Sequence, residues 1–129
     1  MSNTAVTNLT LTAYGTEAAF ASTAATATGA SAAEIFDITP TKVGSKLLIG
    51  IVNAAANQGA VAWSIAAGGL WAAGAAKAGS VAQGATEIIQ IETGKYLGTN
   101  GKIAISLTPT TGKILLTNHV AAVYAIEMV

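Results

Sequence analysis

Hydrophobic and polar residues alternate with a period of two in several short segments of the chain. The clearest is residues 61–65, VAWSI, in which large apolar side chains are separated by small ones. Successive side chains of an extended strand point to opposite faces, so this alternation predicts a strand with one apolar face. Residues 103–108 and 122–128 show the same pattern. The periodicity favours β-structure, and we expect Trp63 to lie in a core between two sheets.

Further strands are expected where short apolar runs are bounded by turn residues. They cover residues 4–13, 35–39, 45–52, 86–91, 95–97 and 113–117. Asn100-Gly101 predicts a two-residue type I′ turn that joins the strand at 95–97 to the strand beginning at Ile103. Residues 108–112, TPTTG, predict a longer turn. About eight short strands are typical of an all-β fold, an antiparallel β-sandwich, and the number fits a jelly roll.

The segment between Lys46 and Lys77 contains no charged residue, which raises the question of a membrane-spanning helix. Polar and glycine residues interrupt the apolar run, and much of the remainder is Ala and Gly, so we expect no span. Residues 66–78 contain three glycines, each of which disfavours a helix relative to Ala. One helical turn or an ordered loop is therefore expected there.

The N-terminal part differs in composition from the rest of the chain. Residues 16–33 are almost wholly Ala, Thr, Ser and Gly, and Phe20 is the only large side chain. Such a segment offers little apolar surface to offset the entropy lost on ordering. It predicts either a flexible leader or an extended arm that is ordered against a neighbouring subunit. We therefore divide the chain into an N-terminal arm or leader, 1–33, and a β-sandwich domain, 34–129.

Charge is scarce along the whole chain. Only 9% of residues are charged, the formal net charge is zero, and neither Arg nor Cys occurs. Ordinary soluble domains carry about 25% charged residues. The deficit predicts a surface that lies against other protein, and the balance of charges with no Arg argues against nucleic-acid binding. Without Cys, the chain has no disulfide, thiolate zinc site or Cys nucleophile.

Side chains for catalysis or metal binding are equally few. The chain has one His, His119, and one Asp, Asp37, and we expect His119 to be a surface or hydrogen-bonded structural residue. Glu87 and Glu92 are five residues apart, which places them on opposite faces of one strand. The Gly-Lys pairs lack the Ser or Thr that a phosphate-binding loop needs. We therefore expect no enzyme activity, no cofactor and no metal.

The expected strand faces point to assembly with other protein. In the expected register, alanines face away from the core at Ala60, Ala62, Ala66, Ala121 and Ala125. Small uncharged faces allow close approach of another subunit, so we expect a homo-oligomer, with a trimer preferred. Trp is enriched at the centres of interfaces, which makes Trp71 the first candidate for a contact with a partner, with a place in the core as the alternative. The other candidate interface residues are Leu70, Phe20, Leu9 and Leu11.

Three stretches resemble a known class of protein. Residues 34–42 (EIFDITPTK), 46–53 (KLLIGIVN) and 113–120 (KILLTNHV) resemble the small β-sandwich decoration, or cement, proteins of bacteriophage capsids. The resemblance implies a virion protein, a trimer on the capsid exterior that bridges subunits of the major capsid protein. No site residue is carried over. The alternatives are a tail-fibre or spike subunit that binds a receptor or glycan, and a surface-layer or pilus-type subunit.

Overall fold

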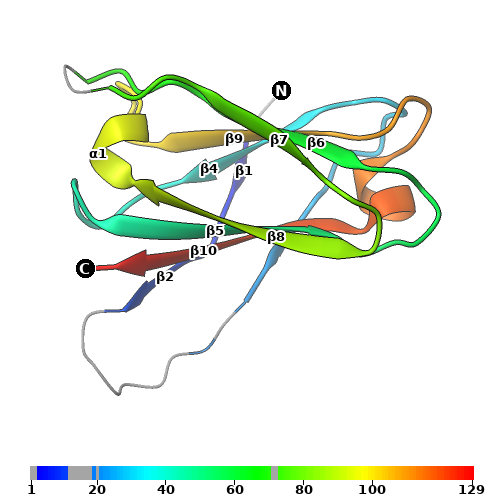
Figure 1. Cartoon of the computed structure of the whole chain (residues 1–129), viewed down its shortest axis with the longest axis horizontal. Helices are drawn as coiled ribbons and strands as arrows, with labels where there is room; N and C mark the ends of the chain where they lie inside the picture. Colours follow the sequence, from blue (N-terminus) through cyan, green and yellow to red (C-terminus); the bar gives the residue numbers. More distant parts are fainter. Residues whose placement is uncertain (1–2, 12–18, 20, 71–72) are drawn as a thin grey trace.

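Two β-sheets packed face to face form the molecule in the computed structural model, which describes residues 3–11, 19, 21–70 and 73–129 (Figure 1). The first sheet has the order β1 (Thr4–Ala5), β4 (Glu34–Ile38), β9 (Ile103–Thr108), β6 (Val61–Ile65) and β7 (Lys77–Val81). The second has the order β2 (Asn8–Leu11), β10 (Ala121–Met128), β5 (Lys46–Asn53) and β8 (Ala85–Glu92), and β3 (Thr23–Ala24) also pairs with β10. The expected all-β sandwich is confirmed.

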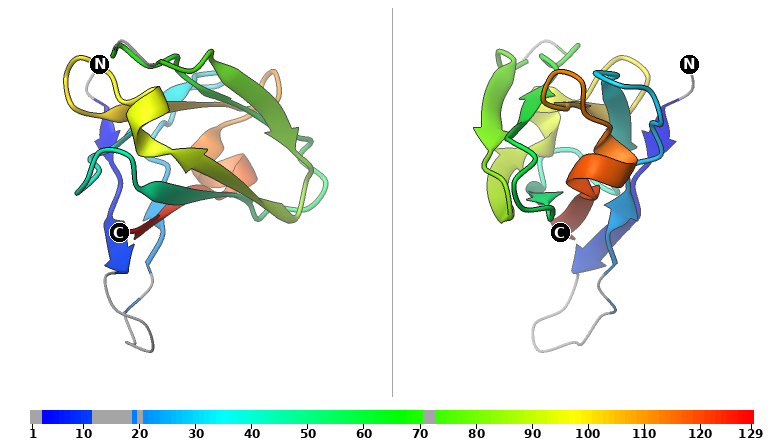
Figure 2. Two further views of the ribbon diagram at one scale, coloured as in Figure 1. Left: turned by 60° about the vertical axis from the view of Figure 1, so that its left-hand side comes forward. Right: turned by 90° about the vertical axis from the view of Figure 1, so that its right-hand side faces the viewer.

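The sheets are mixed, although we expected antiparallel pairing throughout. β1 runs parallel to β4, and β2 runs parallel to β10, while the other described pairs are antiparallel. Residues 3–11 run down one side of the sandwich, so that β1 joins the first sheet and β2 the second (Figure 2). The strand expected at 4–13 is thus divided near Val6, whose buried side chain joins the core. Residues 23–24 add the short strand β3 from the segment expected to be an arm or leader.

The core lies between the sheets and is built from the alternating positions that the sequence indicated in β6 and β9. The side chains that are wholly buried there include Phe36, Ile38, Leu47, Ile49, Ile51, Ile65, Ile103, Ile105 and Leu107. Trp63 packs against this cluster, as expected. Its ring covers Gly79 on β7, where an added Cβ would lie only 2.7 Å from a ring carbon. Gly79 therefore provides the space that the indole occupies.

Strand β10 faces the core with the opposite set of residues from the one expected. Ala121 and Ala125 are each 2% exposed and point inward, whereas Tyr124 and Ile126 are half-buried on the outer face. Both faces of this strand are largely uncharged, so alternation alone does not identify the inner one. The decisive contact is made by Glu127, whose carboxylate is fully buried among hydrogen-bond donors. The alanines at 60, 62 and 66 are exposed, as expected.

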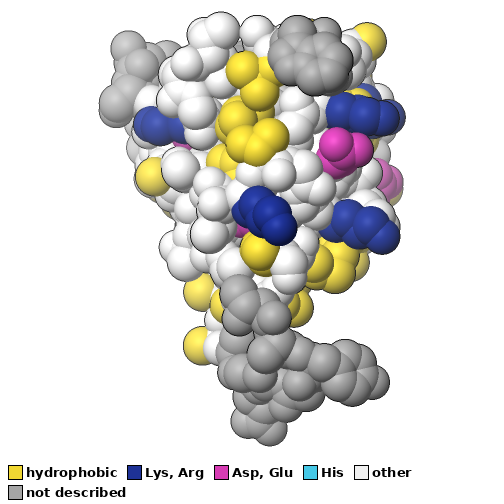
Figure 3. Space-filling model, turned by 90° about the vertical axis from the view of Figure 1, so that its left-hand side faces the viewer, with side chains coloured by type: hydrophobic (Ala, Val, Ile, Leu, Met, Phe, Trp, Pro, Cys, Tyr) yellow, Lys and Arg dark blue, Asp and Glu magenta, His cyan; other side chains and the backbone are white. Residues whose placement is uncertain are grey.

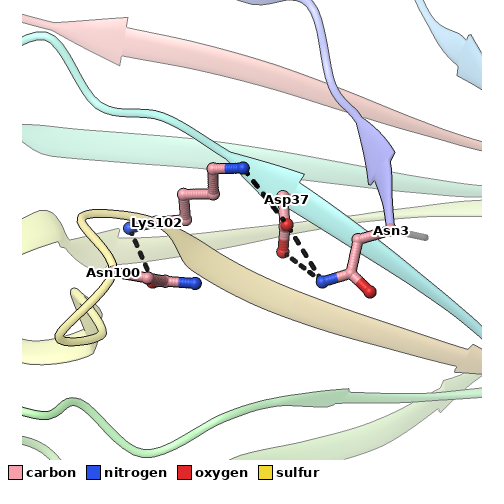
Figure 4. Close-up of polar contacts among 4 residues, drawn as sticks. All are labelled: Asn3, Asp37, Asn100 and Lys102. Carbon is pink, nitrogen blue, oxygen red and sulfur yellow. Dashed lines mark hydrogen bonds and ion pairs between the residues drawn. The ribbon is translucent and has the colours of Figure 1, made fainter. Parts of the chain in front are cut away.

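The strand expected at residues 95–97 is wrong. The chain forms a single helical turn, α1 (Thr93–Tyr96), closed by a hydrogen bond in which the N–H of Leu97 donates to the carbonyl of Thr93. The turn at Asn100-Gly101 is also not of type I′, because only Gly101 has a positive φ, +77°. Instead, the side-chain oxygen of Asn100 accepts the N–H of Lys102 at 3.1 Å (Figure 4). This local bond offers the backbone an alternative to strand pairing.

The strand expected at residues 113–117 is also wrong. A π-helical turn, η1 (Leu115–His119), takes its place. The side-chain oxygen of Asn118 accepts the N–H of Ile114 at 2.9 Å, and Val120 adopts a left-handed φ of +50° that ends the turn. These bonds hold Leu115 and His119 inside the protein.

The Gly- and Ala-rich segment contributes one strand that the sequence did not indicate. Residues 66–70 and 73–76 are irregular, and β7 begins at Lys77. The amphipathic pattern is weak in β7 because Lys77, Ala78, Gly79 and Ser80 are all exposed. None of the helices in the described residues is long and apolar enough to cross a membrane.

Candidate interaction surfaces

Glu127 is a buried carboxylate that joins three parts of the chain. One oxygen accepts the backbone N–H of Thr41 at 2.7 Å and the side-chain amide of Asn8 at 2.8 Å. The other accepts the backbone N–H of Lys42 at 2.9 Å and the hydroxyl of Ser45 at 2.6 Å. Burial raises the pKa of Glu127, but these hydrogen bonds outweigh it and hold the pKa below its usual value. The carboxylate therefore stays ionised and fixes the β4–β5 loop and β2 to β10.

Glu34 plays the corresponding part on the first sheet. Its carboxylate accepts the backbone N–H groups of Thr26 and Ala27 and the hydroxyl groups of Thr4 and Thr26. Burial raises the pKa of Glu34, but the hydrogen bonds lower it by more, so the pKa lies below its usual value. Because Thr4 belongs to β1 and Thr26 follows β3, Glu34 attaches two N-terminal segments to the sandwich.

His119 is a hydrogen-bonded structural residue, one of the two roles expected for it. Its side chain is fully buried, with Nδ1 3.1 Å from Oδ1 of Asn53 and Nε2 accepting the backbone N–H of Thr110 at 3.2 Å. This arrangement assigns the ring proton to Nδ1. Burial, followed by the positive charge of Lys113, lowers the pKa of His119. The imidazole is neutral and both of its nitrogens are engaged.

Asp37 is the third buried acid of the described residues. Both of its oxygens accept the side-chain amide of Asn3, at 2.9 and 3.0 Å, and the ammonium of Lys102 lies 3.7 Å from one of them (Figure 4). Asn3 precedes β1, so this contact also attaches the N-terminal segment. Glu87 and Glu92 lie on opposite faces of β8, as expected, because their partners on β5 are Ile51 and Lys46. Within the described residues, no three His, Asp or Glu side chains are placed to hold a metal ion.

The outer surface of the second sheet is a broad area without charge, which we name the uncharged face. It is formed by outward-pointing residues of four neighbouring strands: Leu9, Leu11, Ala122, Tyr124, Ile126, Met128, Leu48, Gly50, Val52, Thr86, Ile88 and Gln90. Charge enters it at one end only, where Lys46 and Glu92 are cross-strand neighbours. Ile88 is 72% exposed, more than any other large apolar side chain of the described residues.

A groove of about 250 Å³ crosses the uncharged face. Its floor is Gly50 in the central strand β5, and its walls include Ile88 of β8 and Tyr124 of β10. A Cβ on Gly50 would lie 3.1 Å from the Tyr124 ring, so glycine keeps the floor low. Ligand pockets for small molecules usually measure about 300–1,000 Å³, and this groove is closer to the size of one or two side chains.

Lysines gather at one end of the sandwich, which we name the lysine end. β5, β7 and β9 all begin there, and α1 and the β4–β5 loop lie beside them. The lysines brought together are Lys42, Lys46, Lys77, Lys95 and Lys102, all exposed. Figure 3 shows this end of the molecule, with Lys side chains dispersed over hydrophobic and uncharged surface and Asp or Glu side chains beside some of them. The lysine end borders the uncharged face at Lys46.

The residues expected at a partner interface fall in different places. Leu9 and Leu11 lie on the uncharged face, opposite Ile126 and Met128 of β10. Leu70 is 38% exposed in the loop between β6 and β7, on the other sheet. Trp71 and Phe20 lie outside the described residues. The sequence reasoning missed Ile88 and the groove, although the apolar run Ile88-Ile89 was a usable signal, because one of two adjacent strand residues must point outward.

Comparison with known proteins gives no match to a protein-family model, a curated protein or a solved structure.

Proposed function

We propose that this chain is a structural virion protein that decorates the outside of a bacteriophage capsid. In this proposal it bridges subunits of the major capsid protein and associates with copies of itself. The observation that carries the proposal is the uncharged face, four strands wide, on a chain whose buried acids and single His are all hydrogen-bonded within the fold. A large uncharged surface is suited to permanent contact with protein.

The function would be thermodynamic rather than chemical. A protein that binds the assembled lattice but not the free subunits stabilises the lattice by mass action. The sandwich would act as a rigid bridge, and the internal bonds of Glu34 and Glu127 support this role because they attach the N-terminal strands to it. The proposal includes two expectations from the sequence: that the sandwich is of the jelly-roll type, and that the chain forms the trimer that the resemblance implies.

The test is whether the chain is a component of DNA-filled particles. Particles from cells that produce the chain are separated on a density gradient, and the chain is detected in the head fraction, the tail fraction and the soluble fraction. We expect it in the head fraction, at a fixed ratio to the major capsid protein. Recovery with isolated tails would favour the tail-fibre or spike alternative, and absence from particles would refute the virion proposal.

A second measurement tests the stabilising role. Particles stripped of the chain are compared with particles to which it has been added back, and capsid disruption is followed on heating. We expect the reconstituted particles to withstand a higher temperature, since binding to the assembled state alone shifts the equilibrium toward it. Equal disruption temperatures would contradict the bridging role.

A further inference from the structure

The uncharged face carries a protruding side chain and a hollow on the same surface. Ile88 stands out from the edge strand β8 with 72% of its surface exposed. The groove over Gly50 lies immediately beside it, between β8 and β10. A contact between two identical surfaces about a twofold axis requires that each surface be complementary to itself. A projection and a recess on one face meet this requirement.

The size of the face suits a specific contact between proteins. Three strands of eight residues and one of four, at about 4.8 Å spacing and about 3.4 Å per residue, give a footprint of about 450 Å². Two such faces bury about 900 Å², close to the value of about 1,000 Å² at the lower limit for a specific interface. The groove itself is smaller than the usual pocket for a small molecule, as noted above, which favours a protein side chain as its occupant.

The charges also favour a second copy over a charged partner. Away from Lys46 and Glu92, the face offers no ionic group to attract an acidic or basic surface. The chain has zero formal net charge, so two copies meet without net long-range repulsion. The outer surface of the first sheet is charged, because it carries the Asp37–Lys102 ion pair. It also exposes the large apolar side chain of Ile35, which is 42% exposed.

We propose that the uncharged face is a self-association surface, on which a second copy of this chain docks face to face with its Ile88 in the groove over Gly50. This rests on the self-association part of the proposed function, replaces the trimer there with a twofold pair, and does not depend on the capsid. It names the surface and the symmetry of the contact, a twofold pair. A trimer would instead require a head-to-tail contact between two different surfaces.

The experiment measures the mass of the full chain in solution by sedimentation equilibrium, from 1 to 100 µM. The test variant is Ile88→Lys, and the matched control is Ile35→Lys, which places the same charge at an exposed isoleucine on the opposite sheet. We expect the wild type and the control to form dimers. Ile88→Lys should weaken dimerisation at least about tenfold, because an unpaired ammonium would have to be buried in the groove.

A second variant, Ile88→Ala, removes the projection without adding charge and should weaken dimerisation in the same direction. Circular dichroism and urea unfolding establish that each variant is folded, and the exposure of both isoleucines makes folding the expected outcome. A monomeric wild type at 100 µM, a trimer, or equal weakening by the two lysine variants would overturn the proposal. Because these measurements use free protein, they are independent of whether the chain is found in particles.

Discussion

Replacing Glu127 with Gln tests whether the buried carboxylate holds the N-terminal strand and the β4–β5 loop to β10. The substitution keeps the size of the side chain but exchanges one acceptor oxygen for an amide NH₂. In either orientation the NH₂ would face a backbone N–H, that of Thr41 or that of Lys42, and neither can accept a hydrogen bond. One hydrogen bond is therefore lost outright, and the remaining bonds no longer have a charged acceptor.

The magnitude follows from the lost bond and the lost charge. A hydrogen bond to a charged group contributes about 1.5–3 kcal/mol and a neutral one about 0.5–1.5 kcal/mol. Losing one bond and weakening the other three should therefore lower the free energy of unfolding of Glu127→Gln by about 3 kcal/mol or more. With a slope of about 1.5 kcal/mol per molar urea, the unfolding midpoint should fall by about 2 M. The assay is urea unfolding at pH 7, followed by circular dichroism. Glu92→Gln is the matched control, since Glu92 is exposed, and its effect should stay within about 0.5 kcal/mol.

The effect of Glu127→Gln should also depend on pH in a defined direction. The folded-state pKa of Glu127 lies below the reference value of 4.5, so the wild-type carboxylate contributes stability that is fully present above pH 4.5. That contribution is lost as the pH falls through the folded-state pKa, and the difference between wild type and variant should shrink there. A variant within 0.5 kcal/mol of the wild type at pH 7, or a difference that grows on acidification, would refute the reasoning.

Three further predictions concern the interior. Because the folded-state pKa of His119 lies below 6.5, the free energy of unfolding should fall as the pH drops below about 6.5, and urea titrations of His119→Gln should lack this component. Gly79→Ala should destabilise by about 1–3 kcal/mol and alter tryptophan fluorescence, because the new methyl would meet the Trp63 ring. Asn53→Ala should cost about 2 kcal/mol in thermal unfolding, since it leaves His119 and the carbonyls of Gly59 and Val81 without their partner.

The sequence predicted the strands and their inner faces correctly where a strand buries only one of its two faces. In β6 and β9 the residues on the outer face are small or polar, so the alternation identified both the strand and its inner side. In β10 the two faces are similar in polarity, and the inner side is set by the donors that surround Glu127. Those donors come from segments more than 80 residues earlier in the chain, and no local pattern contains them.

The errors at α1 and η1 have a common cause. Both segments carry apolar residues that belong to the core, Tyr96 and Leu97 in one and Leu115 in the other, so their composition favours a strand. Their conformation is fixed by local hydrogen bonds. The backbone carbonyl of Thr93 accepts the N–H of Leu97 and closes α1. The side chains of Asn118 and His119 accept the N–H groups of Ile114 and Thr110 and shape η1. The position of the uncharged face was equally hidden, since it depends on which strands are neighbours and in which register.

The low charge content is distributed unevenly between the interior and the surface, because acids are buried and lysines are exposed. Of the six Asp and Glu residues in the sequence, Glu34, Asp37 and Glu127 are buried. Five of the six lysines are exposed at the lysine end, whereas Glu87 and Glu92 are the exposed acids of the described residues. A partner that covers the uncharged face therefore meets apolar side chains at its centre and the neighbouring Lys46 and Glu92 at one border. Apolar contact would supply affinity there, and the two opposite charges at the border would supply orientation.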